Sequence, residues 1–314
     1  MRVKLGRPSL DPYLPRFDVP AAAGDLSVTF AGVSTLVFDD GASAVMFDGF
    51  FSRPSLVQVA LRRLRPDVSR IDDSLGRLGF GSGAGQRRLE AVVPVHSHFD
   101  HVMDSAEVAR RTGAVLVGGE STANVGRGAG LAEDRLHTVS SGDEVSYGTW
   151  SLTFLASDHC PPDRFPGVID KPLVPPARAK AYRCGEAWSV LLEHSSGPTA
   201  LVQGSAGFVP GALAGRRADV AYLGVGQLGV QDTDYMESYW THTVRALGCR
   251  RVVLTHWDDF FRPLDRPLRA LPYVGDDLDA TMRVLEPLAA ADGVELHFPS
   301  VWRREDPWAP VRGS

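Results

Sequence analysis

At residues 95–101 the chain reads Val95-His96-Ser97-His98-Phe99-Asp100-His101. Four of these side chains, three imidazoles and one carboxylate, can ligate a metal ion. Clustered polar groups cost about 1–3 kcal/mol each when they are buried without partners, and a bound metal ion removes that cost. The pattern His-x-His-x-Asp-His therefore predicts the centre of a metal-dependent active site.

The residues on either side of the cluster predict a strand before it and a helix after it. The continuous apolar run at 91–95 is typical of a buried strand. Asp104-Ser105-Ala106-Glu107 has the pattern of a capping box, which would open a helix to about Arg111. The cluster would then follow the carboxyl end of a strand, where α/β folds place their sites.

Strand patterns come first and last in each half of the chain, with helical patterns between them. Strands are expected at 26–30, 34–38, 42–47, 91–95, 114–117, 145–156 (two strands), 182–193, 199–202, 218–223, 251–255 and 294–298, and helices at 55–64, 71–78, 104–111, 234–247 and 277–290. This order predicts two β-layers with helices outside. Residues 1–25 form an irregular lead-in and 26–314 a single domain. The glycine-rich segment 79–85 is expected to be a plain linker, since no Gly-Lys-Ser/Thr follows it.

Two further histidines stand at the ends of expected strands. His159 follows the strand pattern at 145–156, and His256 follows the one at 251–255. Strand ends at one edge of a sheet converge, so both imidazoles could join the cluster. Imidazole and carboxylate ligands suit zinc, with iron or manganese as alternatives. The other histidines are expected to be ordinary surface or hydrogen-bonded residues: His137, His194, His242 and His297.

This set of residues resembles the metallo-β-lactamase superfamily, from about residue 26 to 298. The resemblance implies an α/β fold (α+β in some schemes), a four-layer αββα sandwich with a dinuclear metal site at one edge. The first metal would be held by His96, His98 and His159, and the second by Asp100, His101 and His256. Asp48, at the end of a strand, would not bind a metal itself but would contact and orient residues that do.

Within this superfamily the chain is most similar to the branch that contains ascorbate-6-phosphate lactonase and the N-acyl-phosphatidylethanolamine-hydrolysing phospholipase D. The similarity lies in the early hairpin, the long segment between His159 and Ser205, and the ending from Gly248 to His256.

The chain departs from the family pattern at Gly204-Ser205. Most hydrolases of the superfamily have Gly-Asp here, and that carboxylate bridges both metals. A serine hydroxyl is a poor ligand, so each metal keeps three protein ligands and the second is expected to bind more weakly. A metallo-β-lactamase subclass with Ser at this place is similar. Asp158 and Asp258 are sequence neighbours of ligands and are expected to orient them.

These features predict a hydrolase of the dinuclear zinc type. Zinc lowers the pKa of bound water from about 15.7 to roughly 7. The resulting metal-bound hydroxide would attack a lactone, ester or phosphodiester, and Asp100 would act as the catalytic residue that orients it or protonates the leaving group. Two alternatives stay open, a mononuclear iron dioxygenase and a metal-binding protein without turnover. Oxygen-reducing di-iron relatives have Glu at the place of His98.

The proline-rich segment 160–178 begins directly after His159. Arg164, Lys171 and Arg178 make it a candidate lid for an anionic small-molecule substrate, against the alternative of a solvated surface loop. Trp257, next to His256, could line the site with aromatic surface.

Composition narrows the class of protein. The 314 residues are 44% hydrophobic and 23% charged, as in globular proteins, and the net charge of −5 argues against a nucleic-acid partner. Three scattered cysteines, Cys160, Cys184 and Cys249, predict no disulfide framework and a reducing compartment. No run reaches the ~20 apolar residues of a membrane span. Without an apolar signal region near the N-terminus, we expect a cytoplasmic protein.

Overall fold

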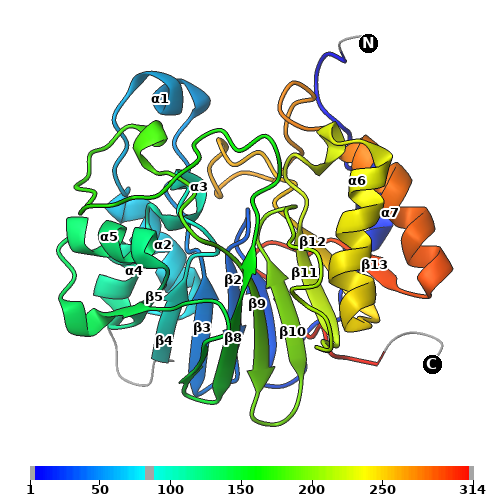
Figure 1. Cartoon of the computed structure of the whole chain (residues 1–314), viewed down its shortest axis with the longest axis horizontal. Helices are drawn as coiled ribbons and strands as arrows, with labels where there is room; N and C mark the ends of the chain where they lie inside the picture. Colours follow the sequence, from blue (N-terminus) through cyan, green and yellow to red (C-terminus); the bar gives the residue numbers. More distant parts are fainter. Residues whose placement is uncertain (1–3, 82–87, 311–314) are drawn as a thin grey trace.

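Two seven-stranded β-sheets pack face to face, with helices on both outer sides, in the computed structural model of the chain (Figure 1). The structure describes residues 4–81 and 88–310. Helices α2, α4 and α5 lie on one side of the sheets and α6 and α7 on the other (Figure 1). The predicted four-layer αββα sandwich is confirmed.

Each sheet combines an antiparallel part with a parallel part. The first sheet runs in the order β14 (Arg304–Glu305), β1 (Ser27–Phe30), β2 (Leu36–Asp39), β3 (Ser43–Phe47), β4 (Arg88–Val93), β5 (Val115–Gly118), β6 (Leu136–Thr138). The second runs β13 (Glu295–His297), β12 (Arg251–Thr255), β11 (Val220–Gly224), β10 (Thr199–Gln203), β9 (Ala187–His194), β8 (Trp150–Ser157), β7 (Glu144–Tyr147). Strands β3 to β6 of the first sheet are parallel to one another, and so are strands β10 to β13 of the second sheet. The carboxyl ends of the parallel strands in each sheet therefore share one edge.

The helices fall into two groups along the chain. The first half contains α1 (Leu56–Leu61), α2 (Val68–Leu78), α3 (Phe99–Val102), α4 (Ser105–Thr112) and α5 (Glu120–Gly128), and the second half contains α6 (Thr233–Trp240), continued by a π-helical turn (Thr241–Arg245), and α7 (Leu278–Asp292). Short 3-10 turns occur at Asp11–Arg16, Glu133–Arg135, Ala179–Ala181 and Leu228–Val230. Among the described residues, no helix has the length and apolar content to cross a membrane.

The main core lies between the sheets and is built largely from aromatic and branched side chains. The Phe38 ring packs edge-on against Phe47, Trp150 and Tyr222, at centroid distances of 5.6, 6.0 and 5.6 Å. Burial of such large side chains stabilises the sandwich by about 1.5–3 kcal/mol each. This core supports the strands whose carboxyl ends share one edge.

Two local predictions need correction, and one helix was missed. Asp104 does not cap α4, because its carboxylate instead accepts hydrogen bonds from the backbone N–H groups of Phe51 and Ser52 at 2.8 and 2.6 Å. Helix α5 was not predicted, since its glycines and small polar residues carry little apolar periodicity. The lead-in contains a 3-10 turn at Asp11–Arg16. The linker predicted at 79–85 lies mostly outside the described residues.

Candidate metal centre

Six predicted ligands reach the same edge from the ends of three strands. The cluster at 96–101 follows β4, His159 follows β8, and His256 follows β12. Because β3 and β4 are parallel, with Phe47 opposite Val93, Asp48 also arrives beside the cluster. The structure divides the six residues into two groups of three.

The first ligand group consists of His96, His98 and His159, whose ligating atoms all lie within 4.8 Å of one another. Nε2 of His96 is 3.1 Å from Nδ1 of His98. Two nitrogens bound to one tetrahedral zinc ion lie roughly 3.3 Å apart, given zinc–nitrogen bonds of about 2.0–2.1 Å. The spacing of this group therefore fits a single metal ion.

The second ligand group consists of Asp100, His101 and His256. Oδ2 of Asp100 lies 3.5 Å from Nε2 of His256 and 3.8 Å from Nε2 of His101. The Nε2 atom of His101 is buried and has no hydrogen-bond partner. A metal ion would satisfy this atom, since a buried polar atom without a partner is costly. The His96 and His101 rings are 3.9 Å apart between centroids, so the two groups adjoin.

The electrostatics favour the metal-binding forms of several side chains. Burial lowers the pKa of His96 and of His98, and it lowers the pKa of His159 to about 4, with neighbouring imidazoles adding to the effect at His96 and His159. Burial acts to raise the pKa of Asp100, but His101 and His256 outweigh it and lower that pKa. Neutral imidazoles and an ionised carboxylate are the forms that bind metal ions.

Asp48 fixes the orientation of His101. The Asp48 side chain is fully buried, Oδ1 accepts the Val95 N–H at 2.9 Å, and Oδ2 lies 2.7 Å from Nδ1 of His101. Burial acts to lower the pKa of His101, but the carboxylates of Asp48 and Asp100 outweigh it and raise that pKa. Occupying Nδ1 leaves Nε2 for a metal, an arrangement common among histidine ligands.

Asp258 acts on His256 through the backbone of Val33. The N–H of His256 donates to the Val33 carbonyl at 2.7 Å, and the Val33 N–H donates to Oδ1 of Asp258 at 2.8 Å. The other oxygen of Asp258 forms a fully buried ion pair with Arg53 at 2.7 Å. Asp258 therefore positions the loop that holds His256, without touching the imidazole.

Ser205 lies beside the segment that carries His159. Its Oγ accepts the N–H of Cys160 at 2.9 Å, and Nδ1 of His159 donates to the carbonyl of Cys160 at 2.7 Å. This bond leaves Nε2 of His159 for a metal. Ser205 thus stabilises the backbone on which the orientation of His159 depends.

Asp163 was not predicted from the sequence. Its Oδ1 lies 3.2 Å from Nε2 of His98, and with Cys184 these residues form a third close group of potential ligands. A hydrogen bond to Asp163 leaves Nδ1 of His98 for the first ligand group. The sequence signal for Asp163 is an acidic residue four positions after His159, inside the segment 160–178.

The structure places the residues predicted to contact substrate on the surface or in the core. Arg164, Lys171 and Arg178 are exposed, and none lines the cavity beside His159. Trp257 is buried, and its ring packs edge-on against Phe17 and Phe298, so it belongs to the core. The aromatic neighbour of the ligands is Phe260, whose ring centroid is 5.6 Å from that of His256 and 6.3 Å from that of Phe99.

A cavity of about 490 Å³ opens beside the first ligand group. Its lining includes His159, Asp158, Asp163, Cys184, Phe208 and Tyr235. Asp158 is exposed to solvent as well as lining this cavity. This volume is in the range of cavities that hold small molecules.

Comparison with known proteins gives a family match and several structural likenesses. Residues 28–201 match the family model described as the Metallo-beta-lactamase superfamily. No curated protein sequence matches the chain.

Among solved structures, a possible metal-dependent hydrolase from Veillonella parvula DSM 2008 is similar at 12% identity and a TM-score of 0.54, over 90% of this chain and 99% of that chain. CmlA, a diiron beta-hydroxylase from Streptomyces venezuelae, is similar at 12% identity and a TM-score of 0.52, over 90% of this chain and 54% of that one. At these identities the likeness shows the fold alone.

Proposed function

The chain belongs to the metallo-beta-lactamase superfamily, and we propose that it is a metal-dependent hydrolase with a dinuclear zinc centre. His96, His98 and His159 would hold one ion, and Asp100, His101 and His256 the other. The observation that carries the proposal is the pair of adjoining ligand groups, each with three ligating atoms within 4.8 Å of one another. No carboxylate stands at position 205, so the second ion would bind more weakly than in a carboxylate-bridged site.

When bound, zinc supplies a Lewis acid that polarises a carbonyl or phosphoryl oxygen and lowers the pKa of water. The chain's own residues prepare the site for this chemistry. Asp48 and Asp163 hold the rings of His101 and His98, while the Phe260 ring packs edge-on against His256 and lies next to Phe99. Asp100 is the group we assign to orienting the nucleophile or passing a proton to the leaving group, because it is ionised and lies among the ligands.

The cavity lining favours an uncharged acyl substrate, a lactone or an ester, over a phosphodiester. Two carboxylates, those of Asp158 and Asp163, line the cavity, and no Lys or Arg is among the described residues that do so. Carboxylates in the lining repel an anion, so a phosphodiester would gain less from this cavity than a neutral ester. A place near the lactonase branch of the superfamily agrees with this preference and rests on the sequence resemblance.

Metal analysis and turnover test the proposal together. We expect about two zinc ions per chain after reconstitution, and hydrolysis of members of a panel of lactones, p-nitrophenyl esters and bis(p-nitrophenyl) phosphate. His98→Ala should abolish both turnover and the binding of the first zinc ion. His137→Ala is a matched control, because His137 is exposed on β6, where Tyr147 is its hydrogen-bond partner.

The competing function is iron-dependent oxygen chemistry. The chain shares its fold with CmlA, a diiron beta-hydroxylase, so iron content and oxygen consumption should be measured as well. Protein that purifies with iron and consumes oxygen, but hydrolyses nothing in the panel with any metal, would overturn the hydrolase proposal. Zinc binding without any turnover would favour a binding protein and would also count against it.

A further inference from the structure

Helix α1 turns an apolar face to solvent. Leu56, Val57 and Leu61 are 59%, 64% and 71% exposed, and no residue of the helix is buried. At about 100° per residue they share one face with Ala60, roughly 140° wide. The polar Gln58 lies outside this face and lines a groove instead. This amphipathicity is the reverse of that of a helix packed on a protein core.

Contacts on its inner side hold α1 in place. Ser55 and Gln58 form a reciprocal capping box at its N-terminus. The half-buried Val59 and the buried Leu64 pack in an apolar cluster that includes Phe99, and Leu64 pairs with Ala177 of the 160–178 segment. The exposed face is therefore presented by a helix whose other side is anchored.

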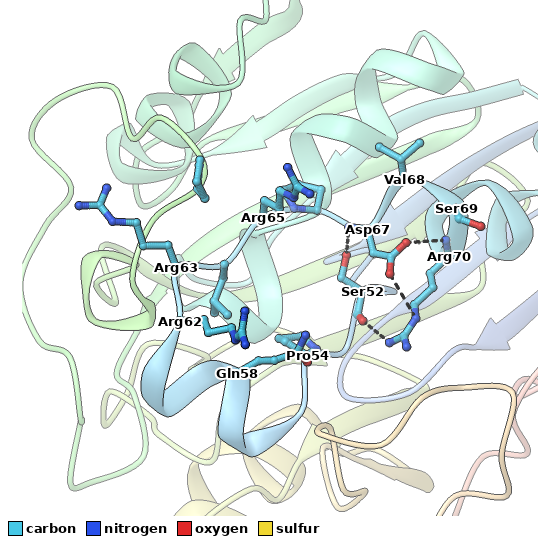
Figure 2. Close-up of a pocket in the computed structure, with 13 residues that line it drawn as sticks. Ser52, Pro54, Gln58, Arg62, Arg63, Arg65, Asp67, Val68, Ser69 and Arg70 are labelled. Atoms are coloured by element: carbon cyan, nitrogen blue, oxygen red, sulfur yellow. Dashed lines mark hydrogen bonds and ion pairs between the residues drawn. The ribbon is translucent and has the colours of Figure 1, made fainter.

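Unpaired positive charge follows the apolar face directly. Arg62, Arg63 and Arg65 are exposed and line a groove of about 890 Å³ (Figure 2). Among the described residues, no carboxylate forms an ion pair with any of the three. Asp67, the acidic residue of this groove, is instead paired with Arg70 at 3.4 Å. The chain as a whole has a net charge of −5, so this cationic cluster is a local feature.

We propose that α1 and the arginines after it form a docking surface for a membrane containing anionic phospholipid. We call the residues Leu56, Val57, Leu61, Arg62, Arg63 and Arg65 the α1 surface. The apolar side chains would enter the boundary between headgroups and acyl chains, and the guanidinium groups would bind headgroup phosphates. An apolar face flanked by arginines is the combination that such interfaces attract.

Two other occupants fit the surface less well. A second copy of the chain, joined about a twofold axis, would set the same patch against itself and bring arginines close to arginines. A peptide is usually bound in an apolar groove, whereas here the apolar residues stand on an exposed helix and the adjacent groove is lined by four arginines.

The α1 surface lies on the same edge of the sandwich as the ligand groups. Strand β3 leads through Asp48, which contacts His101, directly into the segment that begins α1. Figure 1 shows α1 at the upper edge of the molecule, beside the green 160–178 segment. Docking would therefore bring the metal side of the molecule toward the membrane, whether or not the centre is a hydrolase.

Vesicle binding by the full chain tests the proposal. The protein would be sedimented with phosphatidylcholine vesicles and with vesicles containing one part in three of phosphatidylglycerol. We expect binding to the anionic vesicles only, weakened by salt. Arg62→Gln, Arg63→Gln and Arg65→Gln together should reduce it about a hundredfold, at about fivefold for each arginine. Leu56→Ser with Val57→Ser should also reduce it, while Leu14→Ser, a residue that is 59% exposed in the lead-in, should leave it unchanged.

A second readout reports insertion without depending on large substitutions. The three native cysteines are buried, so Val57→Cys can be labelled selectively with an environment-sensitive dye. A blue shift with anionic vesicles supports the proposal. Equal binding to both vesicle types, or binding retained in both sets of variants, would overturn it. So would arginine-dependent binding of inorganic phosphate or of poly-glutamate without vesicle binding, or a dimer that Leu56→Ser dissociates.

Discussion

The two ligand groups are built from similar side chains but are held by different parts of the molecule. The second group depends on buried contacts. Asp48 contacts His101. Asp258, paired with Arg53, accepts the N–H of Val33, whose carbonyl is bonded to the backbone of His256. The first group depends on the segment after β8, through Asp163 on His98 and through Cys160 on His159. The fold therefore fixes the second group, whereas a surface segment completes the first.

Because of this difference, the two groups should respond to substitutions in different parts of the chain. Side-chain exposure is 0% for Asp48 but 22% for Asp163. A buried carboxylate interacts with its partner more strongly than one in contact with water. We expect changes in the core to affect the second group and overall stability, and changes in the 160–178 segment to affect the first group alone.

The largest effect is expected from Asp258→Ala. It leaves Arg53 buried without its partner and frees the Val33 loop, and breaking a buried pair in this way costs about 3–5 kcal/mol. Urea unfolding of the metal-free protein would measure this loss. Asp259→Ala is the control next in sequence, because its partners Arg7 and Arg269 are partly exposed and its loss should cost less. Equal losses in the two variants would refute the special role of the buried pair.

Asp48→Asn should weaken the second group selectively. Asparagine keeps the shape and tolerates the positive φ of 57° at this position, but it removes the charge that faces His101. Loss of such a supporting carboxylate lowers metal affinity about 10–100-fold. Zinc competition against a chelator, resolved into two binding steps, would show one step shifted. A uniform fall in both steps would mean that the two groups are not separately supported.

Asp163→Asn tests the first group in the same way, with a smaller change of about tenfold because the carboxylate is partly exposed. The same chelator competition would follow the step that His98→Ala removes. Asp170→Asn, an exposed position in the same segment, should change neither step. If Asp163→Asn leaves the first step unaltered, its contact with His98 does not orient the ligand.

Ser205→Asp should have the smallest effect and the opposite sign. A carboxylate at this position can still accept the Cys160 N–H and could add charge to the second group, raising its zinc affinity several-fold. Ser205→Asn matches aspartate in size without the charge, so it should not produce the gain. No rise in affinity with aspartate would show that position 205 does not limit binding of the second ion.

Much of the architecture could be predicted because it depends on local patterns of apolar and polar residues. The alternation of strand and helix patterns indicated the sandwich, and the motif at 96–101 with His159 and His256 indicated which side chains would meet. Parallel strands end at a common edge, so positions at strand ends can be placed without knowing the packing. Boundaries and helices without apolar periodicity, such as α5, could not be placed in this way.

Local sequence patterns are therefore sufficient to predict which metal-capable side chains meet, their order along the chain and the strands that carry them. Which residues support these side chains depends on contacts between distant segments. Asp48 and His101 are 53 residues apart and Val33 and Asp258 are 225 apart, so no local pattern links them. The same holds for Trp257 in the core and for the apolar face of α1 in solvent, because burial depends on which distant segments pack against a residue.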